Sequence, residues 1–183
     1  MRDAHECPSF EIGKVGMGRK ARFLKDGGCY YIQIQSFLGK EIFKEDHDYR
    51  WIIQLFRRYK LRYGVNVYAY CLLPMEVHLI VHPRESRNLP QFMQGVNQAY
   101  AKHFNCKYNH SGKVWGQRYR SALIHNDKDL VDAVKLVEFI PVEKKQSCSP
   151  TEYPWSSCSL RILGSGSIID TMPPENPVES LIS

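Results

Sequence analysis

Residues 65–81 read Val65-Asn66-Val67-Tyr68-Ala69-Tyr70-Cys71-Leu72-Leu73-Pro74-Met75-Glu76-Val77-His78-Leu79-Ile80-Val81. Two nearly continuous apolar runs, Val65–Leu73 and Val77–Val81, are separated by Pro74. Short apolar runs that are rich in β-branched and aromatic residues and bounded by a turn residue are typical of buried strands. The stretch therefore predicts two central strands that pair antiparallel across the Pro74 turn.

Further strands and helices can be placed on both sides of this pair from apolar periodicity and from the residues that start and stop helices. The predicted elements are a strand at 29–35 after the Gly27-Gly28 turn, a helix from Asp46 or Asp48 to about Arg62 that Gly64 ends, a helix from Asn88 to about Phe104, a strand near 119–125, and a helix at 130–139 that Pro141 halts.

The predicted order is β-α-β-β-α-β with an additional C-terminal helix. We therefore expect an α+β fold of the ferredoxin-like kind, in which the helices pack on one face of an antiparallel sheet. This domain is expected to cover residues 27–160, between an N-terminal arm at 1–26 and a flexible C-terminal tail at 161–183.

Composition excludes several classes of protein. The chain is 43% hydrophobic and 24% charged, as soluble globular proteins are. It contains no apolar run near 18 residues and no apolar signal segment at its start, so we expect a cytoplasmic protein without membrane partners. The six cysteines never occur at a CxxC spacing, which gives no support to a zinc knuckle or a redox motif.

Positive charge is concentrated in one part of the chain, which has a net charge of +6. The segment Ser86–Asn126 contains no Asp or Glu. An uninterrupted positive field is what a polyanion such as DNA needs, because each neutralised phosphate releases counterions. A solvated basic face is the alternative. The basic residues of the segment are Arg87, Lys102, Lys107, Lys113, Arg118 and Arg120.

Four blocks of the sequence resemble those of a known family. The segment 68–81 is similar to the family signature AYCLMPNHVHLLV, and 112–121, which reads GKVWGQRYRS, resembles its G-x-x-W-Q-x-R-[FY]-x-S block. Residues 153–157, YPWSS, match the YxWSS that closes the family domain, and 27–32 stand where the family has GxxYHV. On these blocks the chain is identified as similar to the REP-associated tyrosine transposases, over about residues 17–158.

The resemblance implies a metal-dependent enzyme that cuts and rejoins single-stranded DNA beside hairpins. Two histidines at i and i+2 on a strand point to the same face, about 6.5 Å apart, and can share one divalent ion. The resemblance further implies a helix-borne tyrosine that attacks the phosphate, and an Asn or Gln one helical turn later that completes the coordination.

This chain departs from that pattern at three of the four positions. The first histidine position is Glu76, whereas the second, His78, is retained. The nucleophile position is Leu136 and the position of the third metal ligand is Ile140, neither of which can perform the family chemistry. Tyr31 stands where the family has a histidine on its first strand. We therefore expect no catalytic nucleophile.

Glu76 and His78 leave two alternatives open. They could hold a weakly bound divalent cation such as Mg²⁺ or Mn²⁺, since carboxylate and imidazole are a valid ligand pair. The other interpretation is a Glu–His hydrogen bond on the open face of the sheet. His82 lies about 13 Å along the strand from His78 and cannot join the same ion.

The expected partner is single-stranded or hairpin DNA, and a homodimer is an open alternative. Trp115 is either a platform for a base or an apolar plug below the basic loop. Tyr119 is the remaining tyrosine to weigh as a substitute nucleophile, but its basic neighbours suit phosphate contact better. The expected DNA contacts are Lys113, Trp115, Arg118, Arg120 and Lys107.

The leading hypothesis is thus a transposase-like DNA-binding protein with lost or impaired cleavage. The alternatives are a residual metal-dependent DNA nicking and rejoining transposase with an altered metal site, and a decayed gene product. An RNA-binding module is less favoured, because the first strand lacks an aromatic and basic RNA signature.

Overall fold

The computed structural model of the protein describes residues 24–162 and 168–172. Its four strands form one sheet in the order β2-β3-β1-β4, and every neighbouring pair is antiparallel. This is the ferredoxin-like order, so the predicted α+β fold is confirmed. In chain order the elements are β1 (Cys29–Gln35), the short 3-10 turn η1 (Phe37–Gly39), α1 (Asp46–Tyr63), β2 (Val65–Leu73), β3 (Glu76–Pro83), α2 (Asn88–Lys107), β4 (Arg120–Ile124), α3 (Asp127–Glu143) and α4 (Cys158–Ile162).

The stretch around Pro74 forms the hairpin that its sequence predicts. Leu73 of β2 pairs with Glu76 of β3, and Cys71 pairs with His78 two residues further along each strand. Since side chains alternate along a strand, Glu76 and His78 share one face of the sheet while Val77 lies on the other.

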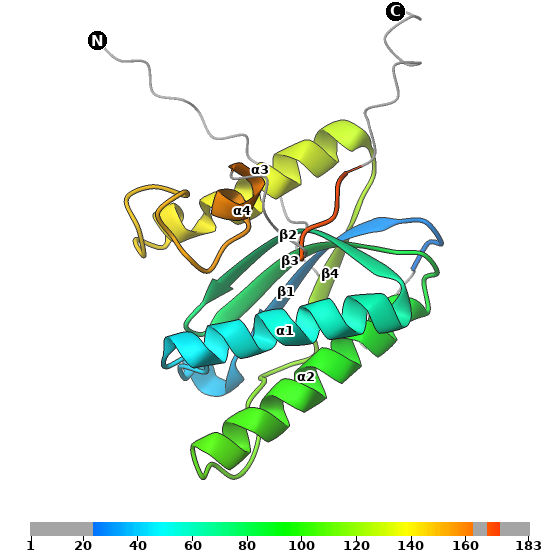
Figure 1. Cartoon of the computed structure of the whole chain (residues 1–183). Coiled ribbons are helices and arrows are strands. Elements are labelled where there is room, and N and C mark those ends of the chain that lie inside the picture. The colour runs from blue at the N-terminus through cyan, green and yellow to red at the C-terminus, as the bar shows by residue number, and fades with distance from the viewer. Residues whose placement is uncertain (1–23, 163–167, 173–183) are drawn as a thin grey trace, which may run out of the picture.

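Alternate residues of the strands belong to two separate cores, one on each face of the sheet. Tyr30, Ile32 and Ile34 of β1 pack with α1 and α2, whereas Tyr31 packs with α3. Figure 1 shows α1 and α2 together on one side of the sheet and α3 with α4 on the other. The expectation that the helices share one face therefore applies to α1 and α2. The additional helix covers the opposite face because the central strands are apolar on both sides.

Helix α1 begins as its acidic first turn predicts. Its N-cap is Glu45, and the Asp48 carboxylate accepts hydrogen bonds from the backbone N–H groups of Lys44 at 3.0 Å and Glu45 at 3.3 Å. The helix ends at Gly64, whose φ of 59° and ψ of 51° are left-handed, a conformation that glycine adopts without a steric penalty.

Helix α3 is longer than predicted, because Pro141 does not halt it. The helix continues through the proline to Glu143 and is closed by a hydrogen bond from Lys144 N–H to the Ile140 carbonyl at 2.9 Å. A proline this close to the end removes one backbone hydrogen bond, and burial of Ile140 and Pro141 offsets that loss. The extra turn carries Lys144 toward Glu76 at the start of β3.

The outer edge of β2 is covered by segments from the C-terminal part of the chain. Leu72 N–H donates to the Trp155 carbonyl and Ser157 N–H donates to the Tyr70 carbonyl, both at 2.9 Å, so the 153–157 block closes this edge. Asp170 N–H donates to the Val67 carbonyl at 2.7 Å. An edge strand covered in this way has few free backbone groups left for pairing with another chain.

The predicted terminal segments lie largely outside the described residues, which exclude 1–23, 163–167 and 173–183. Within the predicted tail, Ile168 is fully buried and Asp170 contacts Lys60 of α1. In the described part of the chain no helix is long and apolar enough to cross a membrane.

Candidate nucleic-acid interface and the Glu76–His78 site

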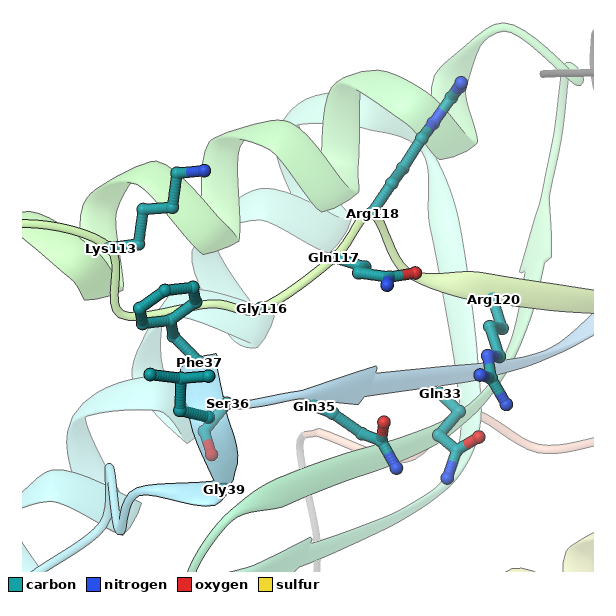
Figure 2. Close-up of a pocket in the computed structure, with 11 residues that line it drawn as sticks. Gln33, Gln35, Ser36, Phe37, Gly39, Lys113, Gly116, Gln117, Arg118 and Arg120 are labelled. Carbon is teal, nitrogen blue, oxygen red and sulfur yellow. The ribbon is translucent and has the colours of Figure 1, made fainter. Parts of the chain in front are cut away.

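A cavity of about 480 Å³ lies at the end of β1, between this strand, the η1 turn and the segment that leads into β4. We call it the basic groove. Lys113, Arg118 and Arg120 line it together with Gln33 and Gln35 of β1, and Figure 2 shows the Arg120 side chain beside Gln33 and the Arg118 side chain pointing away from the glutamines. All three cations are solvent-exposed, and none of the described lining residues is acidic. The groove therefore combines fixed positive charge with amide groups that can donate and accept hydrogen bonds.

Backbone hydrogen bonds hold the wall of the groove in place. Gly116 N–H donates to the Gln35 carbonyl at 3.0 Å, and Phe37 N–H donates to the Val114 carbonyl at 2.8 Å. A Cβ atom at Gly116 would lie 2.9 Å from the Ser36 carbonyl oxygen, so only glycine allows the two segments to approach this closely.

The Trp115 indole is an apolar plug below the basic segment. Its Nε1–H donates to the Asn97 carbonyl of α2 at 2.9 Å, and its ring centroid lies 5.5 Å from that of Tyr100. Trp115 packs on the α1–α2 core and does not line the basic groove. Its placement therefore favours the structural interpretation of this residue over a base-stacking one.

The structure brings three of the five expected DNA contacts together, namely Lys113, Arg118 and Arg120. Lys107 lies elsewhere, at the end of α2, where its Nζ is 2.7 Å from Asp48 Oδ1 and 2.8 Å from Glu45 Oε1. These hydrogen bonds raise the pKa of Lys107 despite a desolvation cost that acts the other way. Because two carboxylates neutralise this cation, it is poorly suited to phosphate contact.

Glu76 and His78 lie on the sheet face that α3 covers, and not on an open face. His78 is 3% exposed, and its Nδ1 is 2.7 Å from the Tyr31 hydroxyl. Its Nε2 is 3.5 Å from Glu76 Oε2. The other carboxylate oxygen of Glu76, Oε1, is 3.2 Å from Lys144 Nζ. The arrangement is a linear series of polar contacts, Tyr31–His78–Glu76–Lys144, across β1, β3 and the end of α3.

Charge in this network is balanced without an added cation. The His78 imidazole and the Lys144 ammonium lower the pKa of Glu76 to about 2, although partial burial opposes the shift. Burial and the nearby Glu76 carboxylate raise the pKa of Tyr31, so its hydroxyl stays protonated at neutral pH. The ionised carboxylate is thus paired with the ammonium group of Lys144, whose side chain is exposed.

The positions on α3 that would supply the family chemistry are apolar and packed. Ile140 is 4% exposed and belongs to the core between α3 and the sheet, against which Leu136 also packs. A divalent cation here would have one carboxylate and one imidazole as ligands, with Lys144 already 3.2 Å from that carboxylate. These residues do not fit the catalytic metal that the resemblance implies, because a third ligand is missing and an ammonium group opposes the ion.

Two other residues that the sequence singled out lie away from this site. Tyr119 is 7% exposed and packs in the α1–α2 core, on the opposite face of the sheet from His78. It is therefore poorly placed as a substitute nucleophile. His82 lies toward the end of β3, where Nδ1 is 3.1 Å from the Tyr68 hydroxyl and Nε2 is 3.2 Å from the Gly27 carbonyl.

A second cavity, of about 490 Å³, joins the basic groove to the Glu76 site. Both cavities are lined by Gln35, Ser36 and Gly39, and the second also by Glu76 and Lys144. Gln33, at the edge of the basic groove, donates from Nε2 to Glu76 Oε2 at 3.3 Å. The two features are therefore one continuous surface along the end of β1.

Sequence reasoning missed Gln33, Gln35 and Lys144. Strand alternation puts both glutamines on the same face as Tyr31, which was a usable signal. Lys144 carried no such signal, because the expected end of the helix at Pro141 removed it from consideration.

Comparisons with known proteins agree with this architecture. A family model described as IS200-like transposase matches residues 38–135, more than half of the chain. The structure of a REP-associated tyrosine transposase bound to a REP hairpin is similar, with a TM-score of 0.68 and 16% identity over 87% of this chain and 94% of the other. A crystal structure of a candidate transposase from Deinococcus radiodurans R1 has a TM-score of 0.46 and 15% identity over 69% of this chain and 95% of the other. Among curated proteins no match is found.

The matched family segment runs from the η1 turn into α3 and thus includes β3, with Glu76 and His78, and the three groove cations Lys113, Arg118 and Arg120. The ferredoxin-like strand order and the additional helix over the β3 face accompany that match. The chain belongs to the IS200-like transposase family.

Proposed function

We propose that this protein binds DNA that contains a hairpin or a single-stranded segment, through the basic groove, and that it does not cut the DNA. The observation that carries the proposal is that Lys113, Arg118 and Arg120 line the same cavity as the amides of Gln33 and Gln35. Cations hold phosphates, and glutamine side chains can form paired hydrogen bonds with base edges. Groups of both kinds line one cavity.

The nature of the DNA is suggested by a protein of the same fold. The REP-associated tyrosine transposase whose structure resembles this chain was solved with a REP hairpin. An unpaired segment is also the form in which bases are free to meet side chains in a groove. We therefore propose hairpin or single-stranded DNA, and not regular duplex, as the preferred ligand.

The loss of cleavage is proposed from the site on β3 and α3. Leu136 and Ile140 provide neither a hydroxyl nucleophile nor an oxygen ligand. The Glu76 carboxylate is engaged by Lys144 and by Gln33, and it faces His78. The network leaves a polar wall beside the groove that can position a nucleotide, while the groups that would break a phosphodiester are missing from their expected positions.

The direct test is binding of fluorescent hairpin, single-stranded and blunt duplex DNA to the full chain, measured by anisotropy over a range of salt concentrations. With three groove cations on phosphates, log affinity should fall with log salt at a slope near −2 on single strands, from about 0.7 for each phosphate. Replacing Arg118 and Arg120 by alanine should reduce the slope by about 1.4 and weaken binding to all sequences.

Arg58→Ala is the matched control, because Arg58 is an exposed cation on α1, away from the groove. It should leave the slope unchanged. An affinity that does not depend on salt would contradict the proposed interface. An equal loss of DNA affinity in Arg58→Ala and in the Arg118/Arg120 alanine variant would contradict it as well. Tight binding to duplex alone would contradict the proposed ligand.

A further inference from the structure

A second group of potential ligands lies far from the Glu76 site, where the start of α1 meets the C-terminal half of α2. One ligand atom from each of His47, Asp48 and His103 lies within 4.8 Å of the other two. His47 and Asp48 are in the first turn of α1, and His103 is one turn from the end of α2. Residues from two packed helices therefore point their nitrogen and oxygen atoms at one point.

His103 provides an independent sign of an incomplete site. Its Nε2 atom is buried and has no hydrogen-bond partner among the described residues. The nearest complementary atom is Asp48 Oδ1 at 3.9 Å, too far for a hydrogen bond. A buried nitrogen without a partner is costly and calls for an explanation such as an ion or water between the two groups.

The surroundings hold two of the three side chains in position. Asp48 is fully buried, and its Oδ2 atom accepts hydrogen bonds from Lys44 N–H and the Tyr108 hydroxyl, whereas Oδ1 lies 2.7 Å from Lys107 Nζ and 3.9 Å from His103 Nε2. The Trp51 ring is stacked on His103 at 4.7 Å between centroids. His47 is exposed and lies 5.5 Å from His103 between centroids, so it can complete the set by a small rotation.

We propose that His47, Asp48 and His103 form a binding site for a divalent transition-metal ion such as Zn²⁺, Ni²⁺ or Cu²⁺. Two imidazoles and one carboxylate are a donor set that these ions prefer and that Mg²⁺ and Ca²⁺ do not. Bonds of about 2.1 Å place tetrahedral ligand atoms about 3.4 Å apart, so the three groups need to approach by an ångström or so. The ion would join the start of α1 to α2, with its fourth position open at the exposed side of His47.

Lys107 is the internal competitor for this ion. Its Nζ lies 2.7 Å from the same Asp48 Oδ1 atom and 2.8 Å from Glu45 Oε1. A bound ion would repel the ammonium group, which can remain with Glu45. Removing this positive charge should therefore strengthen metal binding, which is an effect that ordinary binding to surface histidines would not show.

The test is calorimetric titration of the full chain with Zn²⁺, together with quenching of tryptophan fluorescence by Cu²⁺. We expect one site, a loss of affinity of at least about tenfold in His47→Ala and His103→Ala, and a gain of severalfold in Lys107→Met. Because His47 is exposed, the first of these variants should fold normally, as circular dichroism will show. Quenching should fall in Trp51→Phe, since this ring lies against His103.

His78→Ala is the control, because it alters the Glu76–His78 site and leaves the proposed one intact. Unchanged Zn²⁺ binding in both His47→Ala and His103→Ala would overturn the proposal. Loss of the site in His78→Ala would overturn it as well and would assign the metal to β3. No gain in Lys107→Met would exclude Asp48 as a ligand and would overturn the three-residue assignment.

Discussion

The hydroxyl group of Tyr31 on β1 lies 2.7 Å from Nδ1 of His78 on β3, in the interior between the sheet and α3. Burial raises the pKa of the Tyr31 hydroxyl, and the other ring nitrogen of His78, Nε2, lies 3.5 Å from Glu76 Oε2. The one retained histidine of the family signature thus has both nitrogens directed at protein groups. It supports the network that links β1, β3 and Lys144, and its buried Nε2 atom has no hydrogen-bond partner among the described residues.

A first prediction concerns the acid stability of this network. The folded-state pKa of Glu76, about 2, lies below its ordinary value of 4.5. The stabilisation that this group provides is therefore complete above about pH 4.5 and is lost as the pH falls toward 2. Between pH 6 and pH 3, the free energy of unfolding should therefore fall by about 1 kcal/mol less in Glu76→Gln than in the unchanged protein. This figure is reduced for the partial solvent exposure of the carboxylate.

Urea unfolding at the two pH values measures this difference. Glu41→Gln is the matched control, since Glu41 is an exposed glutamate that lines the same cavity. It should behave as the unchanged protein does. An equal loss of stability in Glu76→Gln and in the unchanged protein would show that Glu76 is not paired as described.

A second prediction is that the scaffold can regain cleavage when the missing groups are restored. The variant Glu76→His/Leu136→Tyr/Ile140→Asn supplies a histidine pair, a nucleophile and a third ligand on the same face of the sheet. With labelled hairpin DNA and Mn²⁺ it should form a covalent protein–DNA adduct on a denaturing gel, whereas the unchanged protein should form none. Placing Asn at buried position 140 should cost about 2–4 kcal/mol of stability.

The same triple variant with Phe in place of Tyr at position 136 is the control, because it has the same bulk without the hydroxyl. It should give no adduct. An adduct with the unchanged chain would refute the proposed loss of cleavage and would favour the alternative of a residual nicking activity.

A third prediction concerns backbone strain at the edge of the basic groove. Leu38 has a φ of 56°, in the left-handed region that most residues with a Cβ atom disfavour, and its side chain is 76% exposed. Since asparagine tolerates this conformation, we expect Leu38→Asn to raise the free energy of unfolding by about 0.5–1 kcal/mol. Thermal unfolding followed by circular dichroism measures the gain.

Leu61→Asn provides the comparison, because Leu61 is equally exposed, at 80%, but has an ordinary helical backbone in α1. There asparagine should lower stability by a few tenths of a kcal/mol, since it is a weaker helix former. A loss of stability in Leu38→Asn would show that the leucine side chain contributes more than the strain costs.

A fourth prediction concerns the segment 168–172 against α1. Lys60, which is 8% exposed, donates from Nζ to both carboxylate oxygens of Asp170 at 2.8 and 2.9 Å and to the Ile168 carbonyl at 2.9 Å. We expect Lys60→Met to lower the free energy of unfolding by about 2 kcal/mol. This is less than the loss when a fully buried ion pair is broken, because Asp170 is partly exposed. The urea midpoint measures this cost.

The double variant Lys60→Met/Asp170→Leu should recover part of the loss, because no charge is then left unpaired. If Lys60→Met leaves the midpoint unchanged, the ion pair does not hold the segment against the domain in solution.

Local sequence patterns were sufficient for the central part of this fold. The apolar runs on both sides of Pro74 fix the β2–β3 hairpin, because a proline-bounded pair of buried strands has one favourable register. Period-two alternation then places Glu76 and His78 on one face, and helical periodicity specifies α1 and α2. The resemblance of four short blocks added the family and the prediction of a degenerate site at Leu136 and Ile140.

Tertiary structure decided what those residues face. Pro141 is a local stop signal, but packing of Ile140 and Pro141 against the sheet carries α3 one turn further and brings Lys144 to Glu76. The charge pattern of the sequence predicted that Lys107 would join Lys113, Arg118 and Arg120 in one basic surface. In the folded protein Lys107 is paired with Asp48 and Glu45. The other three cations line the basic groove. Sequence specifies which groups exist and on which face of an element they lie. Only the packing of elements distant in the chain determines which charges meet a partner inside the protein and which remain for a ligand.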